Sequence, residues 1–160
     1  MMKIFIKSYF ILSIFCTSVF AQIKKHPNVV YVIVDQLRAE STGFNGNKEV
    51  STPNIDKIAK QSINIKNAVS GMSVCTPYRA QLMSGMYPTS TGVFMNDVML
   101  DTTLTTLGKV YRNHGYDTGF IGKWHIDGHG RENFIPESRH QGFDYWNTLE
   151  CTHNYNNSYY

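Results

Sequence analysis

The chain has 160 residues, of which 42% are hydrophobic and 17% charged, so it has enough apolar material for a packed core and does not have the composition of a disordered tail. Its net charge is +3 and its lysines and arginines form no run, which argues against a nucleic-acid partner. Three cysteines without a Cys-x-x-Cys pair argue against both a disulfide scaffold and a thiolate zinc site.

The N-terminus has the pattern of a signal peptide. Lys3 and Lys7 precede a charge-free stretch over 8–23, which is shorter than the roughly 20 residues of a membrane-spanning helix. Val-Phe-Ala at 19–21 then fits a signal-peptidase site. We predict that residues 1–21 are a signal peptide and that the mature protein is secreted or periplasmic, with no membrane contact after cleavage. An N-terminal membrane anchor is the alternative.

The next part of the chain begins with a strand pattern. The unbroken β-branched and aromatic run 29–34 predicts a strand buried on both faces, as in a parallel sheet. A hydroxyl cap followed by Pro53 predicts a helix that begins there. Alternation over 63–66 predicts a short second strand. The predicted helix would bury an apolar stripe made of Ile55, Ile58 and Ala59.

Two more helices and another strand are predicted farther along. One helix covers about 77–85 and ends at a glycine, and a second is capped by threonines and covers about 105–115. The run 118–121 is the next strand, and the Gly-, His- and charge-rich stretch 125–142 is a loop. This order predicts an α/β fold in which a mostly parallel central sheet has helices on both faces.

Polar residues gather where the predicted strands end. Asp35 and Gln36 follow the first strand, and Gly-Lys-Trp-His at 122–125 follows the last. The segment 75–79, which starts with Cys75, lies at the N-terminus of a predicted helix, a place that favours an anion. Open α/β sheets place their chemistry at the carboxyl ends of their strands, so these residues are expected at one rim. Each group also has a structural interpretation: a turn or cap for Asp35, an inert thiol or a disulfide with Cys151 for Cys75, and a buried tryptophan for 122–125.

The segment 75–85, Cys-Thr-Pro-Tyr-Arg-Ala-Gln-Leu-Met-Ser-Gly, resembles the sulfatase signature Cys-x-Pro-Ser-Arg with its following Leu and Thr/Ser-Gly. Segments 27–35, 52–56, 115–125 and 142–144 resemble other sulfatase segments in the family's order. The resemblance implies an alkaline-phosphatase-like fold. Because sulfatases are several times longer than this chain, it also implies that 22–160 are the N-terminal part of a catalytic domain, with an incomplete sheet and no activity alone.

The resemblance also implies a catalytic set. In sulfatases a separate formylglycine-generating maturation enzyme oxidises the signature cysteine to formylglycine, so Cys75 would become the nucleophile as a hydrated aldehyde. Arg79 would hold this group or the metal ligands in place. Lys123 would grip the sulfate and His125 would hydrogen-bond the hydrated aldehyde, which stabilises charge in the transition state.

A divalent cation, usually calcium, is implied as well, because this hard ion prefers oxygen ligands. Asp35, Gln36 and the modified Cys75 would bind it. Gln36 stands where the family often has a second Asp, which removes one negative charge from the site. Tyr78 replaces the usual Ser of the signature, but the Cys, Pro and Arg that the maturation enzyme mainly reads are intact.

The predicted function is therefore that of an exported sulfatase. The aromatic, amide-rich stretch 146–160 suits either contacts with a sugar or a place in core and loop. The predicted substrate is a sulfated glycan or another sulfated small molecule. Two alternatives remain. One is a phosphate or phosphonate ester hydrolase of the same superfamily, because the run Asp-Gln-x-Arg at 35–38 occurs among phosphonate ester hydrolases. The other is a secreted glycan-binding module without catalytic activity, in which Cys75 pairs with Cys151.

Overall fold

A computed structural model describes residues 26–154 and 156 of the chain, which divides into two compact units, Met1–Gln36 and Leu37–Tyr160. In the first unit, residues 26–34 are extended without belonging to a helix or a strand, and a turn follows at 35–36. In the second unit, the first half contains two short 3-10 helices, η1 (Ala39–Ser41) and η2 (Gly43–Asn45), and helix α2 (Pro53–Lys60).

The strand predicted over 29–34 is wrong for this structure. The segment is extended, but no strand pairs with it among the described residues, and the side chain of Val30 is 85% exposed. An extended segment becomes a buried strand only where neighbouring strands satisfy its backbone groups and helices cover its faces. The apolar composition of a segment does not supply those neighbours.

Helix α2 begins at Pro53, as predicted, and its start is tied to η2. The Thr52 hydroxyl donates a hydrogen bond to Asp56 Oδ1 at 2.8 Å and accepts one from the Gly43 backbone N–H at 2.8 Å. The same Asp56 oxygen accepts a hydrogen bond from the Phe44 N–H at 2.9 Å. Polar contacts therefore fix this part of the chain.

The apolar pattern around α2 is not buried in the structure. Ile58 is 67% exposed, so the predicted apolar stripe has no core beneath it. Residues 63–66 form no strand, and Ile63 is 91% exposed, so that prediction is wrong as well. Two-residue alternation over four residues is too short to specify a strand when no partner lies beside it.

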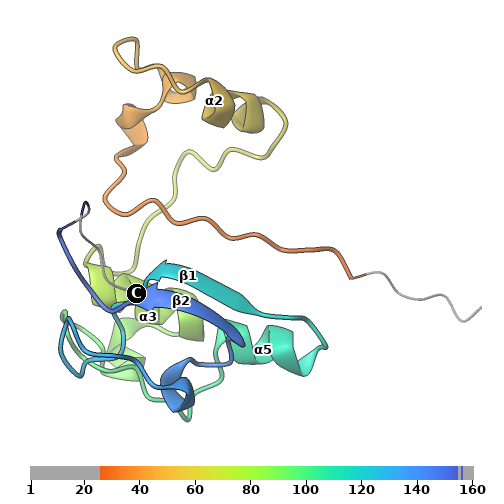
Figure 1. Cartoon of the computed structure of the whole chain (residues 1–160). Coiled ribbons are helices and arrows are strands. Elements are labelled where there is room, and N and C mark those ends of the chain that lie inside the picture. The colour runs from red at the N-terminus through yellow and green to blue at the C-terminus, as the bar shows by residue number, and fades with distance from the viewer. Residues whose placement is uncertain (1–25, 155, 157–160) are drawn as a thin grey trace, which may run out of the picture. The chain divides into compact units, whose positions relative to one another are not determined.

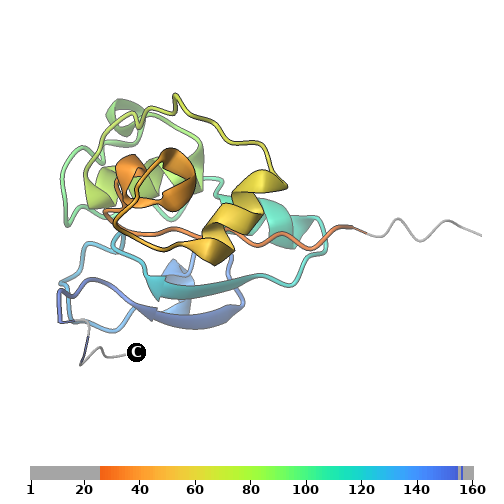
Figure 2. The ribbon, with the colours of Figure 1, turned by 90° about the horizontal axis from the view of Figure 1, so that it is seen from above.

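The second half of this unit contains the sheet (Figure 1). Helices α3 (Cys75–Ser84), α4 (Pro88–Thr91) and α5 (Leu107–Asn113) precede strand β1 (Gly119–Lys123), and the 3-10 helix η3 (Glu137–Arg139) precedes strand β2 (Tyr145–Leu149). The two strands lie side by side in both ribbon views and are parallel, with Gly119 opposite Tyr145 and Lys123 opposite Leu149 (Figures 1 and 2). A parallel sheet was predicted, whereas strand β2 and its pairing with β1 were not.

The hydrophobic core lies between these helices and the sheet. Trp124, which directly follows β1, is 1% exposed and packs edge-to-face against Phe120, Phe143 and Trp146. Such aromatic contacts add about 0.5–1.5 kcal/mol each to the burial of the rings. The other buried apolar residues of this core are Ala80, Met83, Val93, Leu100, Ile126 and Ile135.

The N-terminus of α5 packs directly on the segment that leads into β2. The Thr106 hydroxyl donates a hydrogen bond to the Gln141 carbonyl at 2.7 Å. Gly142 has φ +94°, and a Cβ atom there would lie 2.4 Å from the backbone nitrogen of Lys109, so only glycine fits. This close approach fixes where β2 begins beside β1.

No helix in the described residues is long and apolar enough to cross a membrane. The predicted signal peptide over 1–21 lies outside the described residues.

Candidate active site

Helix α3 places Cys75 at its first position. Val74 is extended (φ −125°, ψ 146°), so the helix begins at Cys75, two residues earlier than predicted, and it ends at Gly85 in the left-handed conformation as predicted. The first N–H groups of a helix lack a partner within the helix. Here the Thr76 N–H donates a hydrogen bond to Asn96 Oδ1 at 3.0 Å, so a distant side chain caps the helix start.

The end of β1 meets the start of α3 through Lys123. Its Nζ lies 3.6 Å from the sulfur of Cys75, which is half-buried. Arg79 is 5% exposed, and its Nη1 donates a hydrogen bond to the Lys123 carbonyl. Three of the four predicted catalytic residues therefore contact one another. They form a compact, positively charged site around position 75.

His125 lies two residues beyond Lys123 and is buried, with 2% exposure. Its backbone adopts a left-handed conformation (φ 57°), which is uncommon for a residue with a side chain. Nε2 of the ring lies 3.0 Å from Asp97 Oδ1, whereas Nδ1 is buried and has no hydrogen-bond partner within the described residues. Burial lowers the pKa of His125, and the hydrogen bond that the ring makes to Asp97 opposes that shift.

Two residues of this network, Asp97 and Arg131, were missed by the sequence analysis. The Arg131 guanidinium binds the Asp97 carboxylate with both Nε (3.0 Å to Oδ1) and Nη2 (2.8 Å to Oδ2). Hydrogen bonds from Arg131 and His125 lower the pKa of Asp97 to about 2. The loop composition of 125–142 marked a polar region, but no local pattern marks Asp97 as a partner of His125.

Two further carboxylates, those of Asp127 and Glu150, hold the loop that carries His125. Glu150, just after β2, is 2% exposed, and its Oε1 accepts hydrogen bonds from the N–H groups of Asp127 (2.9 Å) and Gly128 (3.1 Å). Asp127 is equally buried, and its carboxylate is bound by the guanidinium of Arg139, with Nη2 3.0 Å from Oδ2. These contacts fasten residues 125–128 to the end of β2.

Glu150 supplies a prediction about stability. Burial raises the pKa of Glu150, so the folded state holds the proton more tightly than the unfolded chain. The stability that it contributes is therefore present at low pH and lost as the pH rises through the raised pKa. Glu150→Gln keeps an acceptor oxygen and removes this loss, so its free energy of unfolding relative to wild type should rise with pH.

Glu150→Ala instead leaves the two backbone N–H groups without their acceptor, which costs about 1–3 kcal/mol. Urea unfolding of the full-length protein at several pH values measures both variants against wild type. Equal destabilisation by alanine and glutamine, at every pH, would show that Glu150 does not act through these hydrogen bonds.

The predicted metal ligands lie in two different units. Asp35 and Gln36 form the exposed turn that closes the first unit, with Gln36 at φ 57°, and Cys75 belongs to the second unit. Within the described residues, no group of three or more His, Cys, Asp or Glu side chains is arranged to hold a metal ion. The metal set of Asp35, Gln36 and Cys75 thus stays a prediction.

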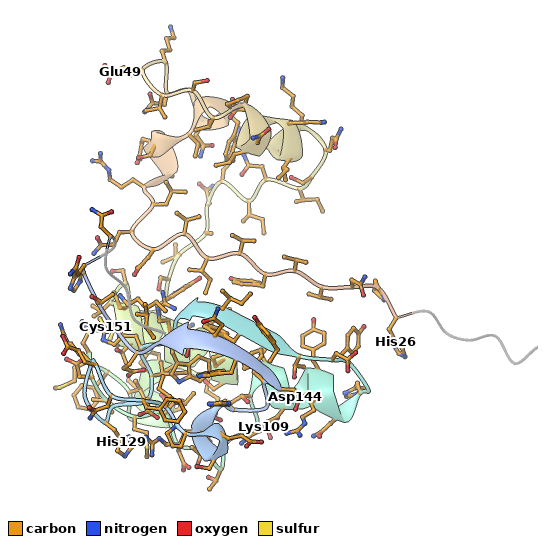
Figure 3. The ribbon with its side chains drawn as sticks, viewed as in Figure 1. His26, Glu49, Lys109, His129, Asp144 and Cys151 are labelled. Atoms are coloured by element: carbon orange, nitrogen blue, oxygen red, sulfur yellow. The ribbon has the colours of Figure 1, made fainter. Side chains whose placement is uncertain are left out.

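Cys75 and Cys151 are both thiols in the structure. Cys151 directly follows Glu150 at the end of β2 and is 1% exposed (Figure 3). Burial raises its pKa, although the positive charges of Lys123 and Arg131 oppose the shift. The disulfide on which the binding-module alternative depends is therefore not formed.

Comparison with known proteins identifies the chain. The family model described as Sulfatase matches residues 27–160, which is most of the sequence. The chain belongs to the sulfatase family. The resemblance of its signature and of the segments around it is thereby confirmed, as is the alkaline-phosphatase-like α/β fold.

Individual sulfatases show the same relationship. The chain is 47% identical over 130 residues to an ulvan-active sulfatase of Formosa agariphila, an alignment that covers 81% of this chain and 25% of that protein. A structure from work on the metabolism of multiple glycosaminoglycans by Bacteroides thetaiotaomicron superposes with a TM-score of 0.72 at 30% identity, covering 80% of this chain and 33% of that one.

A third relative was solved in complex with its substrate, D-glucosamine-2-N,6-O-disulfate. It superposes with a TM-score of 0.65 at 28% identity and covers 76% of this chain and 23% of that one. The chain spans about a quarter of the length of the ulvan-active sulfatase.

Proposed function

We propose that the full-length protein is an exported sulfatase that hydrolyses sulfate esters of a glycan, with position 75 as its nucleophile. The contact between Lys123 Nζ and Cys75 Sγ, 3.6 Å long, carries this proposal. It places a positive charge beside the signature residue at the start of a helix, where an anionic ester would react. Membership of the sulfatase family supports the reaction type.

The residues around position 75 suit oxidation of Cys75 to formylglycine by a formylglycine-generating maturation enzyme. The half-buried side chain of Cys75 lies next to the positively charged Nζ of Lys123. A positive charge there stabilises both an oxygen-rich nucleophile and the sulfate that it attacks. Formylglycine supplies a hydrated aldehyde as the nucleophile in place of a thiol.

Each surrounding residue then has a role in the reaction. Lys123 stabilises the negative charge that develops on the sulfate oxygens, an effect worth about 3–4 kcal/mol for one well-placed donor. Arg79 binds the carbonyl of Lys123 from a buried position and so holds the end of β1 against α3. His125, whose pKa burial lowers, is neutral near neutral pH and can accept a proton.

A calcium ion fits the chemistry of the residues at the end of the first unit. Asp35 offers a carboxylate and Gln36 an amide oxygen, both of the hard type that calcium prefers. Calcium takes 6–8 oxygen ligands, so two adjacent residues and position 75 supply only part of a complete set. When bound, such an ion would supply positive charge that favours an anionic ester.

This assignment predicts a contrast between two substitutions. Asp35→Ala should remove the only charged ligand of the pair and abolish stoichiometric calcium, whereas Gln36→Asp should retain the metal and the activity because it restores a second carboxylate. Elemental analysis of the purified full-length variants measures the metal directly. Active wild-type protein that contains no divalent metal and resists chelators would contradict both assignments.

A glycan substrate and export are proposed from the relatives and from the sequence. The relatives include an ulvan-active sulfatase and a protein solved with a disulfated glucosamine. The signal-peptide pattern at 1–21 favours a secreted or periplasmic enzyme that meets such material outside the cytoplasm.

A panel of substrates tests the proposed function. The full-length protein, coexpressed with a maturation enzyme, is assayed against aryl sulfates, sulfated oligosaccharides, aryl phosphates and phosphonate esters. We expect sulfate esters to be hydrolysed with the highest kcat/KM. A preference for phosphonate or phosphate esters would instead support the other hydrolase of the superfamily, since sulfate and phosphate esters have nearly the same shape.

A further inference from the structure

The network behind His125 extends the proposed function, on which this inference rests, to residues that the sulfatase signature does not include. Asp97 follows Asn96 in the segment between α4 and α5, and both residues are tied to the start of α3. Asn96 accepts the Thr76 N–H at 3.0 Å, and the Asp97 N–H donates to the Thr76 hydroxyl at 3.3 Å. The Asp97 carboxylate is thus held relative to the helix that begins with Cys75.

The ionisation of Asp97 determines which ring nitrogen of His125 carries the hydrogen. Two hydrogen bonds from Arg131 and one from His125 keep the carboxylate ionised at neutral pH, with its pKa at about 2. An ionised carboxylate only accepts hydrogen bonds. The Nε2 atom of His125, 3.0 Å from Asp97 Oδ1, therefore carries the hydrogen.

The other ring nitrogen is then the basic one. In a neutral imidazole one nitrogen is a donor and the other an acceptor, so a hydrogen on Nε2 leaves a lone pair on Nδ1. Nδ1 is buried, and it makes no hydrogen bond to any described residue. A buried acceptor without a partner is costly. The charge of Lys123, a predicted catalytic residue, acts on the His125 ring, so a group that takes part in the reaction would satisfy Nδ1.

We propose that Asp97 is a positioning residue that holds His125 in the Nε2–H tautomer, so that Nδ1 is the atom that accepts a proton during sulfate ester hydrolysis. Arg131 anchors the carboxylate by binding both of its oxygens. In the proton transfer, a hydroxyl at the reaction centre gives its hydrogen to Nδ1 and keeps the electron pair of the O–H bond, and the ring becomes an imidazolium ion. The negative Asp97 stabilises that ion.

A purely structural interpretation is the alternative. The Asp97–Arg131 pair is half-exposed (46% and 48%), and exposed ion pairs add little to stability. If Asp97 only joined two loops, its replacement would change stability slightly and leave the tautomer and the pH dependence of the reaction as they are. The two interpretations therefore differ in what they predict for His125 itself.

Nitrogen-15 NMR of histidine-labelled full-length protein provides a readout that does not depend on activity. Wild-type His125, assigned by comparison with His125→Gln, should show a protonated Nε2 and an unprotonated Nδ1 near neutral pH. Asp97→Asn should shift the ring toward the other tautomer, because an amide can turn its NH₂ group toward Nε2. A wild-type ring with the hydrogen on Nδ1 would overturn the proposal, whether or not the protein hydrolyses sulfate esters.

Kinetics provide the second readout. Asp97→Asn should lower kcat by about 10²–10⁴-fold, the range of general acid–base catalysis, with a smaller change in KM. The acidic limb of its kcat/KM profile should move to lower pH, because Asp97 raises the pKa of His125. Arg131→Gln should move that limb to higher pH, because the positive charge of Arg131 lowers the same pKa. Lys123 and Glu150, which also lie near His125, are unchanged in both variants.

Two matched controls separate these effects from general damage. Asp117→Asn alters an exposed aspartate, and Arg112→Gln alters an arginine that pairs with Asp144 at 3.0 Å with 59% exposure. Both should keep wild-type kcat and the wild-type pH profile. If Asp97→Asn also keeps them while wild type is active, the role of Asp97 is refuted although the sulfatase function stands.

Discussion

Hydrolysis of sulfate esters by the full-length protein is expected to fall on the order of 10⁶-fold when Cys75 is replaced with alanine. The loss of an enzyme's nucleophile has effects of this size because the remaining residues cannot form the covalent intermediate. Cys75 is half-buried at the start of α3, so removal of its single sulfur atom should leave the helix in place. Initial rates with an aryl sulfate, compared at equal concentrations of folded protein, measure the change.

Cys151→Ala is the matched control for this variant. Cys151 is a buried thiol that has no role in the proposed reaction, so alanine there should lower the melting temperature somewhat and leave turnover near the wild-type value. Residual activity of Cys75→Ala above about a hundredth of wild type, a far smaller effect than the loss of a nucleophile, would refute position 75 as the nucleophile.

Lys123→Ala should lower kcat by about 10²–10³-fold and leave the melting temperature nearly unchanged. One well-placed charge contact to the transition state is worth about this much. One contact that Lys123 makes to the protein interior uses its backbone, since Arg79 binds its carbonyl, and alanine preserves that carbonyl. Steady-state kinetics and thermal unfolding of the same preparations separate the two effects.

Lys109→Ala provides the opposite pattern. Lys109 lies on α5, and its Nζ donates hydrogen bonds to the carbonyls of Thr102 and Leu104, the latter at 2.8 Å, so it fastens the segment before the helix (Figure 3). Its loss should lower stability by about 1–3 kcal/mol and spare kcat. Should Lys123→Ala behave like Lys109→Ala, losing stability and keeping activity, then Lys123 is structural.

Elements with local signals were predictable from the sequence. Pro53, the glycine after Ser84 and the threonines before Leu107 are such signals, and the helices form close to where they were expected. The threonine hydroxyls do not cap their helices as predicted, because Thr52 bonds Asp56 and Thr106 bonds the carbonyl of Gln141. Strand β1 was also expected. Strand β2 was missed because its aromatic residues were interpreted as sugar contacts or core. In the structure its residues alternate in exposure, with Trp146 and Thr148 less exposed than their neighbours Tyr145 and Asn147, which is typical of a strand.

The strand predicted over 29–34 shows the limit of such signals. Burial on both faces depends on neighbouring strands and helices, and no property of six residues specifies them. The apolar side of α2 has the same limit, since its isoleucines remain exposed.

The candidate catalytic residues that were predictable are those within the family's motifs. Cys75, Arg79, Lys123 and His125 stand in two short segments that resemble sulfatases, and the fold brings the first three into contact. Asp97 lies 28 residues from its partner His125, in a stretch without a motif, so only the folded structure reveals the pair.

Peptide mass spectrometry of the full-length protein, coexpressed with a maturation enzyme, tests most directly whether Cys75 is the modified nucleophile. A proteolytic peptide that contains residues 75–79 should carry formylglycine in place of cysteine, which replaces the thiol with an aldehyde and can be labelled with a hydrazine. Cys151 should remain a thiol in the same sample. An unmodified Cys75, or a Cys75–Cys151 disulfide, in protein that hydrolyses sulfate esters would contradict the proposed mechanism.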